Sequence, residues 1–287
     1  MFEEVSYMVT RIISALVGIP LLLLVTWAGG WVFVAAICLL ACMALYELYM
    51  VLRSRGMELV KEVAYPCALL LSIGAMTLSG DDLNLLFEAV VFVTVVGSLA
   101  FHLVIRTFSH RVSSIGATAF AVLYIGWLFS FFILLRNMRI EGAGWLPIFE
   151  NDVGCAFLFL AYVTTWACDS ASYFVGQKWG RLRIYPMISP GKTLEGAIAG
   201  LTSACITGLV FGIWMGMAGV HALILGFVLG FGGQLGDLLE SIIKRDLQVK
   251  DFGAIIPGHG GVLDRFDSLL INVPLTYFYV LIVLSHP

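Results

Sequence analysis

Long apolar runs follow one another along almost the whole chain, separated by short polar connections. An α-helix needs about 20 apolar residues to cross the hydrocarbon core of a bilayer. Nine stretches qualify, and they predict an all-α, polytopic membrane protein with about nine transmembrane helices. The expected spans are 11–28, 31–52, 60–79, 83–105, 115–135, 153–176, 194–217, 220–243 and 265–284.

The composition agrees with lipid as the solvent. Apolar residues make up 60% of the chain and charged residues only 12%, whereas a soluble domain has about 45–50% and about 25%. The apolar runs continue from end to end, so we expect one membrane domain over residues 1–287 with no soluble appendage.

The basic residues indicate the orientation, because cytoplasmic loops are enriched in Lys and Arg. With nine spans, 14 of the 16 basic residues fall on the side of the N-terminus. Only Arg136 and Arg139 fall on the other side. The sequence therefore predicts a cytoplasmic N-terminus and an outside C-terminus.

The eighth span carries polar side chains at helical spacing. Gln234, Asp237, Ser241 and Lys244 recur at steps of three and four residues, so they share one helix face. A carboxylate in a membrane helix costs at least about 2.5–3.5 kcal/mol on insertion scales, so it persists with a partner or a metal. Asp237 is therefore either part of a packing ion pair or a ligand-binding group, and the Lys244-Arg245 pair at the cytoplasmic end favours the second.

A glycine-rich turn precedes the last span. Residues 257–261 include His259, which is either a structural turn residue or a group facing a ligand. Asp264 and Asp267 follow at i and i+3 near the start of the helix. This position favours phosphate, because the first N–H groups of a helix are exposed.

A third polar element lies at the end of the sixth span. Asp169 and Tyr173 precede a small-residue turn, Ser189 to Gly196, that carries Lys192. The turn is not a P-loop, because the glycine spacing and the preceding strand are absent. For Ser189, helix capping and substrate contact remain open.

These elements share a physical logic. Carboxylates in several places can hold Mg²⁺, which binds through one or two carboxylates together with substrate phosphates. The basic residues can neutralise a polyphosphate, and the polar groups lie at the lipid boundary. We therefore expect metal-assisted phosphoryl or nucleotidyl transfer onto an amphiphile, with residues 1–140 mainly scaffold helices and 150–287 the catalytic half.

The same residues resemble the phosphatidate cytidylyltransferase (CDP-diacylglycerol synthase) family. The family signature spans 27 residues here, from Ser241 through Lys244-Arg245, Lys250-Asp251 and His259-Gly260-Gly261 to Asp264-Arg265-Phe266-Asp267. Asp169, Tyr173 and the turn 189–196 are also similar to the family. The N-terminal half is similar only in hydropathy and in Glu47, near the end of the second span.

The resemblance implies a nine-helix, dimeric membrane enzyme that makes CDP-diacylglycerol and pyrophosphate from CTP and phosphatidic acid. It implies Mg²⁺, held by Asp237 and Asp264, and leaves open a second, monovalent cation. The implied catalytic residues are Asp237, Asp264, Asp267 and Lys244. The implied substrate-binding residues are Asp169, Tyr173, Ser189, Lys192, Thr193, Glu195, Ser241, Arg245, Lys250, Asp251, His259, Gly260, Gly261 and Arg265.

Membrane lipid is the expected surrounding, with the active site facing the cytoplasm, in the plasma (inner) membrane if the source is bacterial. No nucleic-acid partner is expected. Two other functions remain open. A CTP-dependent polyprenol kinase would transfer the γ-phosphoryl group, and an ion-coupled transporter would also carry intramembrane carboxylates. Transporters usually show paired repeats and midplane sites, whereas the charges of this chain gather at one surface.

Overall fold

A computed structural model describes residues 2–105, 111–139, 149, 152–258 and 260–284, with side chains from Ser14 onward except that of Ile105. The chain forms two compact units. The first comprises Met1–Leu134 and Leu247–Arg265, and the second comprises Leu135–Asp246 and Phe266–Pro287. The segment 247–265, which carries much of the family signature, is thus grouped with the N-terminal helices.

The first unit is built from helices in chain order. They are α1 (Phe2–Ala28), α2 (Gly30–Ser54), α3 (Lys61–Thr77), α4 (Gly80–Ile105), α5 (Arg111–Ala121), the π-helical segment η1 (Val122–Trp127) and α6 (Leu128–Arg136), which continues into the second unit. Helix α3 packs against α2, α4 and η1. The close approach of η1 to α3 depends on Gly126, where a Cβ atom would lie 2.9 Å from the Cα of Ala68.

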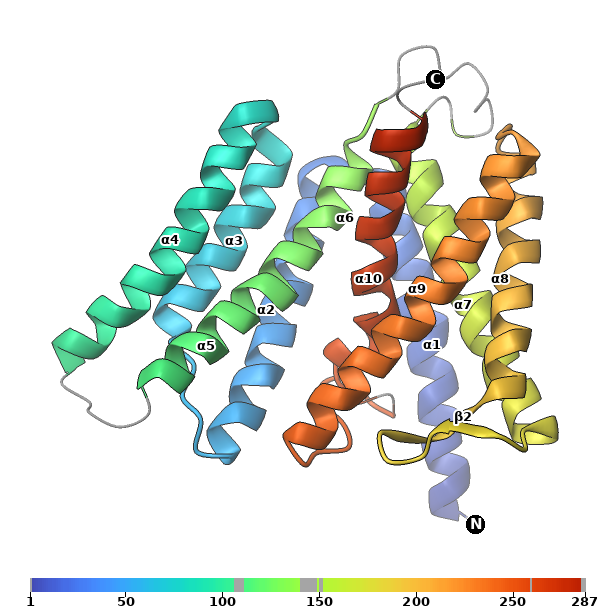
Figure 1. Cartoon of the computed structure of the whole chain (residues 1–287), viewed down its shortest axis with the longest axis horizontal. Helices are drawn as coiled ribbons and strands as arrows, with labels where there is room; N and C mark the ends of the chain where they lie inside the picture. The colour runs from blue at the N-terminus through green and yellow to red at the C-terminus, as the bar shows by residue number, and fades with distance from the viewer. Residues whose placement is uncertain (1, 106–110, 140–148, 150–151, 259, 285–287) are drawn as a thin grey trace. The chain divides into compact units, whose positions relative to one another are not determined.

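The second unit contains three long helices and a hairpin. Its elements are α7 (Val153–Trp179), β1 (Arg183–Tyr185), β2 (Ser189–Thr193), α8 (Leu194–Trp214), α9 (Gly219–Asp246), α10 (Leu263–Tyr279) and the π-helical segment η3 (Val280–Leu284), with the first turn of α10 in the other unit. Helices α7, α8 and α9 run side by side (Figure 1). The antiparallel hairpin β1–β2, which the sequence did not predict, joins α7 to α8.

Small residues explain how closely α8 and α9 pack. The buried positions of α8 recur every four residues and are Gly196, Gly200, Ala204, Gly208 and Gly212. A Cβ atom on Gly208 would lie 2.5 Å from the Cα of Gly226 in α9. Such stripes let backbones approach in membranes, where van der Waals packing drives helix association.

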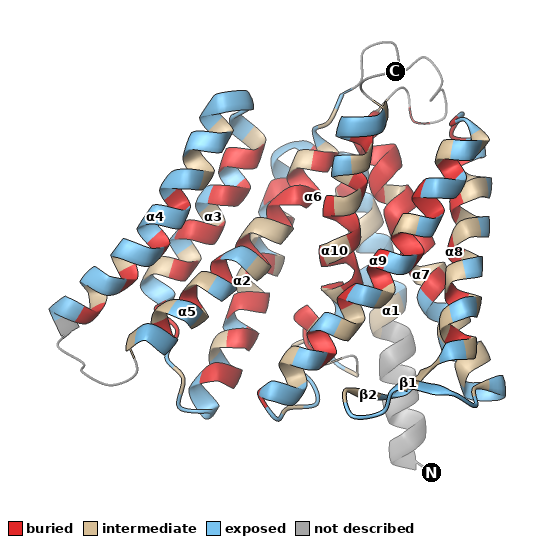
Figure 2. Ribbon diagram, viewed as in Figure 1, coloured by how far each residue is buried: buried red, intermediate tan, exposed pale blue. Residues whose placement is uncertain are grey.

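Burial differs strongly between helices. In α4 only 17% of the apolar window is buried, against 67% in α7, and α4 is mostly pale blue in Figure 2. Phe92, Leu103 and Val104 of α4 are more than half exposed. An apolar surface of this extent is stable in contact with lipid and not with water.

The all-α, polytopic membrane fold is confirmed. Seven helices in the described part of the chain are long and apolar enough to cross a membrane. Helix α3 has 17 residues, and the described apolar part of α1, Ser14–Ala28, is also shorter than a full span. The number of nine crossings and the orientation of the termini stay predictions.

Candidate active site

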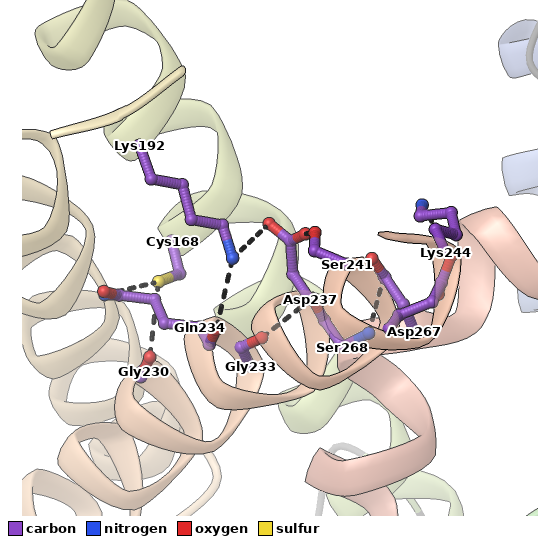
Figure 3. A network of polar contacts seen from close by, with 11 residues as sticks. Cys168, Lys192, Gly230, Gly233, Gln234, Asp237, Ser241, Lys244, Asp267 and Ser268 are labelled. Atoms are coloured by element: carbon purple, nitrogen blue, oxygen red, sulfur yellow. Dashed lines mark hydrogen bonds and ion pairs between the residues drawn. The ribbon is translucent and has the colours of Figure 1, made fainter. Parts of the chain in front are cut away.

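A lysine of the hairpin reaches the polar face of α9. The Nζ atom of Lys192, in β2, lies 3.0 Å from Oδ2 of Asp237 and 3.5 Å from the carbonyl oxygen of Gln234. The hydroxyl of Ser241 donates to Oδ1 of Asp237 at 3.4 Å (Figure 3). The predicted common face is therefore confirmed for Asp237 and Ser241, whereas the side chain of Gln234 donates to the carbonyl of Ala197 at 3.0 Å and Lys244 is described below. Because the Asp237 side chain is 41% exposed, it is accessible to a ligand.

Two further carboxylates lie near Asp237. Asp169 of α7 and Asp267 of α10 both interact electrostatically with it, and Lys192 offsets part of the repulsion. The backbone N–H of Ser268 donates to Oδ1 of Asp267 at 2.6 Å. The residues Asp169, Lys192, Asp237 and Asp267, which we call the acidic cluster, therefore combine three carboxyl groups with one lysine.

Glycines in α9 bring α10 close to this cluster. A Cβ atom on Gly236 would lie 2.6 Å from the carbonyl oxygen of Asp267. The hydroxyl of Ser268 donates to the carbonyl of Gly233 at 3.0 Å. Any larger side chain at position 236 would push Asp267 away from Asp237.

Lys244 has a partner that the sequence reasoning missed. Its Nζ lies 2.8 Å from Oε1 of Glu240, whose side chain is fully buried. This pair ties the last turns of α9 together, and it could have been found from the i, i+4 spacing. The predicted contact between Lys244 and a substrate phosphate stays a prediction.

Three residues predicted to bind substrate form hydrogen bonds that stabilise the β1–β2 hairpin and the start of α8. The hydroxyl of Thr193 accepts the N–H of Gly196 at 3.2 Å and so caps α8. The Glu195 carboxylate accepts the N–H groups of Arg181 and Leu182, and Nε of Arg245 donates to the carbonyl of Ile188 at 2.9 Å. These contacts hold Lys192 in place, and direct substrate contacts by the three residues stay predictions.

The cap of α8 is Thr193, whereas Ser189 lies within strand β2. Capping therefore does not explain Ser189.

Tyr173, in α7, was also predicted to bind substrate. Its side chain is 62% exposed and therefore accessible to a ligand.

The first unit holds the signature loop, residues 252–263. The Oδ2 atom of Asp264 accepts the N–H groups of Phe252 and Gly261, both at 2.9 Å. Gly260 has a φ of +85°, a conformation that favours glycine. Asp264 thus joins the two ends of the loop.

A residue of α2 accepts the backbone N–H groups at the start of α10. The N–H of Val262 donates to Oε1 of Glu47 at 2.9 Å, and the N–H of Leu263 donates to Oε2 at 3.0 Å. The expectation that exposed N–H groups here bind phosphate is wrong for these two positions, because a carboxylate of the same unit already accepts them.

The other predicted residues of this unit lie around the loop. Lys250, Asp251 and Arg265 are exposed. Gly261 is buried against Glu47. His259 lies outside the described residues.

The donor chemistry of the acidic cluster fits Mg²⁺. No group of three His, Cys, Asp or Glu side chains has metal-binding geometry among the residues that the structure describes. Mg²⁺ does not require such a cage, because it binds one or two carboxylates together with phosphate oxygens and waters. Asp237 and Asp264 belong to different units, and their sharing of one ion stays a prediction.

Comparison with known proteins places the chain in a family. The model of the cytidylyltransferase family matches residues 9–283. The phosphatidate cytidylyltransferase of Synechocystis sp. is 32% identical over 292 residues, covering 96% of this chain and 97% of the relative. The Bacillus subtilis enzyme of the same name is 39% identical over 57% of each chain, and that of Staphylococcus haemolyticus is 32% identical over 93% and 95%. This chain belongs to the cytidylyltransferase family.

Proposed function

We propose that the enzyme transfers the cytidylyl group of CTP to phosphatidic acid, producing CDP-diacylglycerol and pyrophosphate. One observation carries the proposal: in a chain matched by the family over nearly its whole length, Lys192 and Asp237 pair beside Asp169 and Asp267. Carboxylates of such a cluster can hold a divalent cation that also binds substrate phosphates, and Lys192 can contact a phosphate directly.

The reaction is a displacement at phosphorus. An oxygen of the phosphatidic acid phosphate attacks the α-phosphorus of CTP and forms a new P–O bond. The bond from the α-phosphorus to the α–β bridging oxygen breaks, and pyrophosphate leaves with its electron pair. A phosphate monoester is already ionised near neutral pH, so no strong general base is needed and His259 need not remove a proton.

The protein's contribution is positioning and charge. Lys192 would exchange its ion pair with Asp237 for a substrate phosphate, since its side chain is 24% exposed. Ser189, Ser241, Lys244, Arg245 and Lys250 would contact other phosphate oxygens. Asp237 and Asp264 would hold Mg²⁺, with Asp267 close by, and the bound ion would neutralise charge that develops on the phosphates.

The site is proposed to face the cytoplasm, where the expected spans place 14 of the 16 Lys and Arg residues. A reporter fused after Ser285 should then behave as non-cytoplasmic. A homodimer is also proposed, and cross-linking in native membranes would test it.

The function is tested with purified protein, CTP, Mg²⁺ and either phosphatidic acid or a polyprenol. CTP should be consumed only with phosphatidic acid, and the lipid product should be CDP-diacylglycerol. CDP together with a phosphorylated polyprenol would assign the chain to the kinases. Ion-dependent solute uptake without CTP turnover would assign it to the transporters.

A further inference from the structure

The start of α10 needs a cap that its own sequence does not supply. The first four N–H groups of a helix have no partner within the helix. Ser, Thr, Asp or Asn usually accepts one of them from the N-cap position. Here the residue before the helix is Val262, which has no acceptor in its side chain, and both Val262 and Leu263 are buried.

Glu47 supplies the missing acceptor from α2. Its side chain lies in an apolar helix and is 2% exposed, and each of its two oxygens accepts one N–H from the start of α10. Hydrogen bonds to a carboxylate are stronger than those between neutral groups. A negative charge at a helix N-terminus is also stabilised by the helix dipole.

The loop is shaped around this carboxylate. A Cβ atom on Gly253 would lie 2.6 Å from Oε1 of Glu47, and one on Gly261 would lie 2.6 Å from Oε2. A side chain at either position would therefore have to displace the carboxylate or the loop backbone. The sequence showed the glycines and the glutamate more than 200 residues apart, without their contact.

We propose that Glu47 is a positioning residue that fixes the signature loop and the first turn of α10, and thereby holds Asp264 in its working geometry. The inference rests on the proposed function, because the loop carries residues assigned to that reaction. Within the described part of the chain, the hydrogen bonds of the Glu47 carboxylate go to backbone N–H groups of the loop, which is a positioning role. Its role connects a helix assigned to the scaffold with the catalytic residues.

The test compares Glu47→Gln and Glu47→Leu with the full-length enzyme in lipid nanodiscs. Gln keeps one acceptor oxygen and nearly the same volume, whereas Leu keeps neither acceptor. In amide exchange, Val262 and Leu263 should exchange at least about 10-fold faster in Glu47→Gln, while α3 and α7 are unchanged. The kcat should fall about 10- to 100-fold, with KM for CTP within about threefold, because small misplacement of a reacting group lowers turnover.

Glu88→Gln is the matched control, since Glu88 is an exposed carboxylate in α4 of the same unit. It should leave exchange and kcat unchanged. Unchanged exchange at 262–263 in Glu47→Gln, or a normal kcat per folded molecule, would overturn the proposal. If Glu47→Leu fails to fold, Glu47→Gln still decides it. Absence of CDP-diacylglycerol with the wild-type enzyme would refute the proposed function instead, since exchange does not depend on turnover.

Discussion

Two regions of the molecule use carboxylates in opposite ways. In the first unit, Glu47 and Asp264 accept four backbone N–H groups, from Phe252, Gly261, Val262 and Leu263. In the acidic cluster of the second unit, Asp237 pairs with the side chain of Lys192 and is 41% exposed. Backbone donors cannot leave without unfolding the loop, whereas a lysine side chain can turn towards a ligand.

This difference separates framework from reactive groups. A carboxylate that accepts buried backbone donors stabilises one conformation, and its loss leaves those donors unsatisfied. A partly exposed ion pair contributes little to stability, so its value lies in what it can bind. Substitutions in the loop should therefore change stability and amide exchange, and those in the acidic cluster should change substrate binding and turnover. Asp264 holds the loop and is also assigned to the ion, so its substitution should change both.

The largest expected effect is on turnover. Asp237→Asn should lower kcat at least about 100-fold, because it removes a charge placed where the reaction develops charge. Asp264→Asn should have a similar effect, and the double variant should be little worse than either, since both residues are assigned to one ion. Turnover against Mg²⁺ concentration measures this.

Asp246→Asn is the control for that series, because Asp246 is exposed at the end of the same helix, α9. Near-normal turnover and Mg²⁺ dependence in Asp237→Asn would rule out the shared ion. Asp237 would then be a packing residue.

The next effect is on substrate affinity. Lys192→Ala should raise KM for CTP about 10-fold, which corresponds to about 1.4 kcal/mol of lost binding. The protein should stay folded, because water can solvate the exposed Asp237. Lys178→Ala is matched, since Lys178 is exposed in α7 and rests over the Trp179 ring. Equal KM values in the two variants would show that Lys192 only neutralises the cluster.

The acidic cluster shows which contacts of the site can be predicted from sequence and which cannot. Helical spacing was enough to place Asp237 and Ser241 on one face, because 3.6 residues per turn is a local rule. The contact of Lys192 with that face depends on the hairpin β1–β2, whose strands no alternating pattern in the sequence predicts. The pairing of Lys244 with Glu240 follows from the i, i+4 spacing, but the family signature includes only the lysine.

A smaller effect, on stability, is expected in the first unit. Gly261→Ala should destabilise the protein by about 1–3 kcal/mol, because the added methyl group overlaps the Glu47 carboxylate. Combined with Glu47→Asp, the loss should be smaller than the sum of the two single losses, since a shorter side chain makes room for the methyl group. Gly116→Ala is the control, because nothing lies within 4 Å of its Cβ position. Additive effects of Gly261→Ala and Glu47→Asp on the thermal midpoint would argue against their contact.

The smallest effect concerns the cap of α8. Thr193→Ala should cost about 1 kcal/mol of stability, while Thr193→Ser should cost little. Thr202→Ala is comparable, because Thr202 is exposed in the same helix and bonds only its own turn. A rise in KM for CTP without loss of stability in Thr193→Ala would instead favour the substrate contact that the family resemblance implies.

In the fold, too, features set by neighbouring residues were predicted, and contacts between distant residues were not. The apolar runs predicted the helices well, since lipid requires every backbone group to bond within its segment. The grouping of 247–265 with the N-terminal helices could not be predicted, because the contact of Glu47 with Val262 spans 215 residues. The sequence signals for this contact are a glutamate at the end of an apolar run, Glu47, and the glycines Gly253 and Gly261.

The most direct test follows the phosphorus atoms of CTP. Purified enzyme receives phosphatidic acid and Mg²⁺ with CTP labelled at either the α- or the γ-phosphate. The α-label should enter the lipid as CDP-diacylglycerol, and the γ-label should appear in pyrophosphate. Transfer of the γ-label to a lipid, with the α-label left in CDP, would contradict the account.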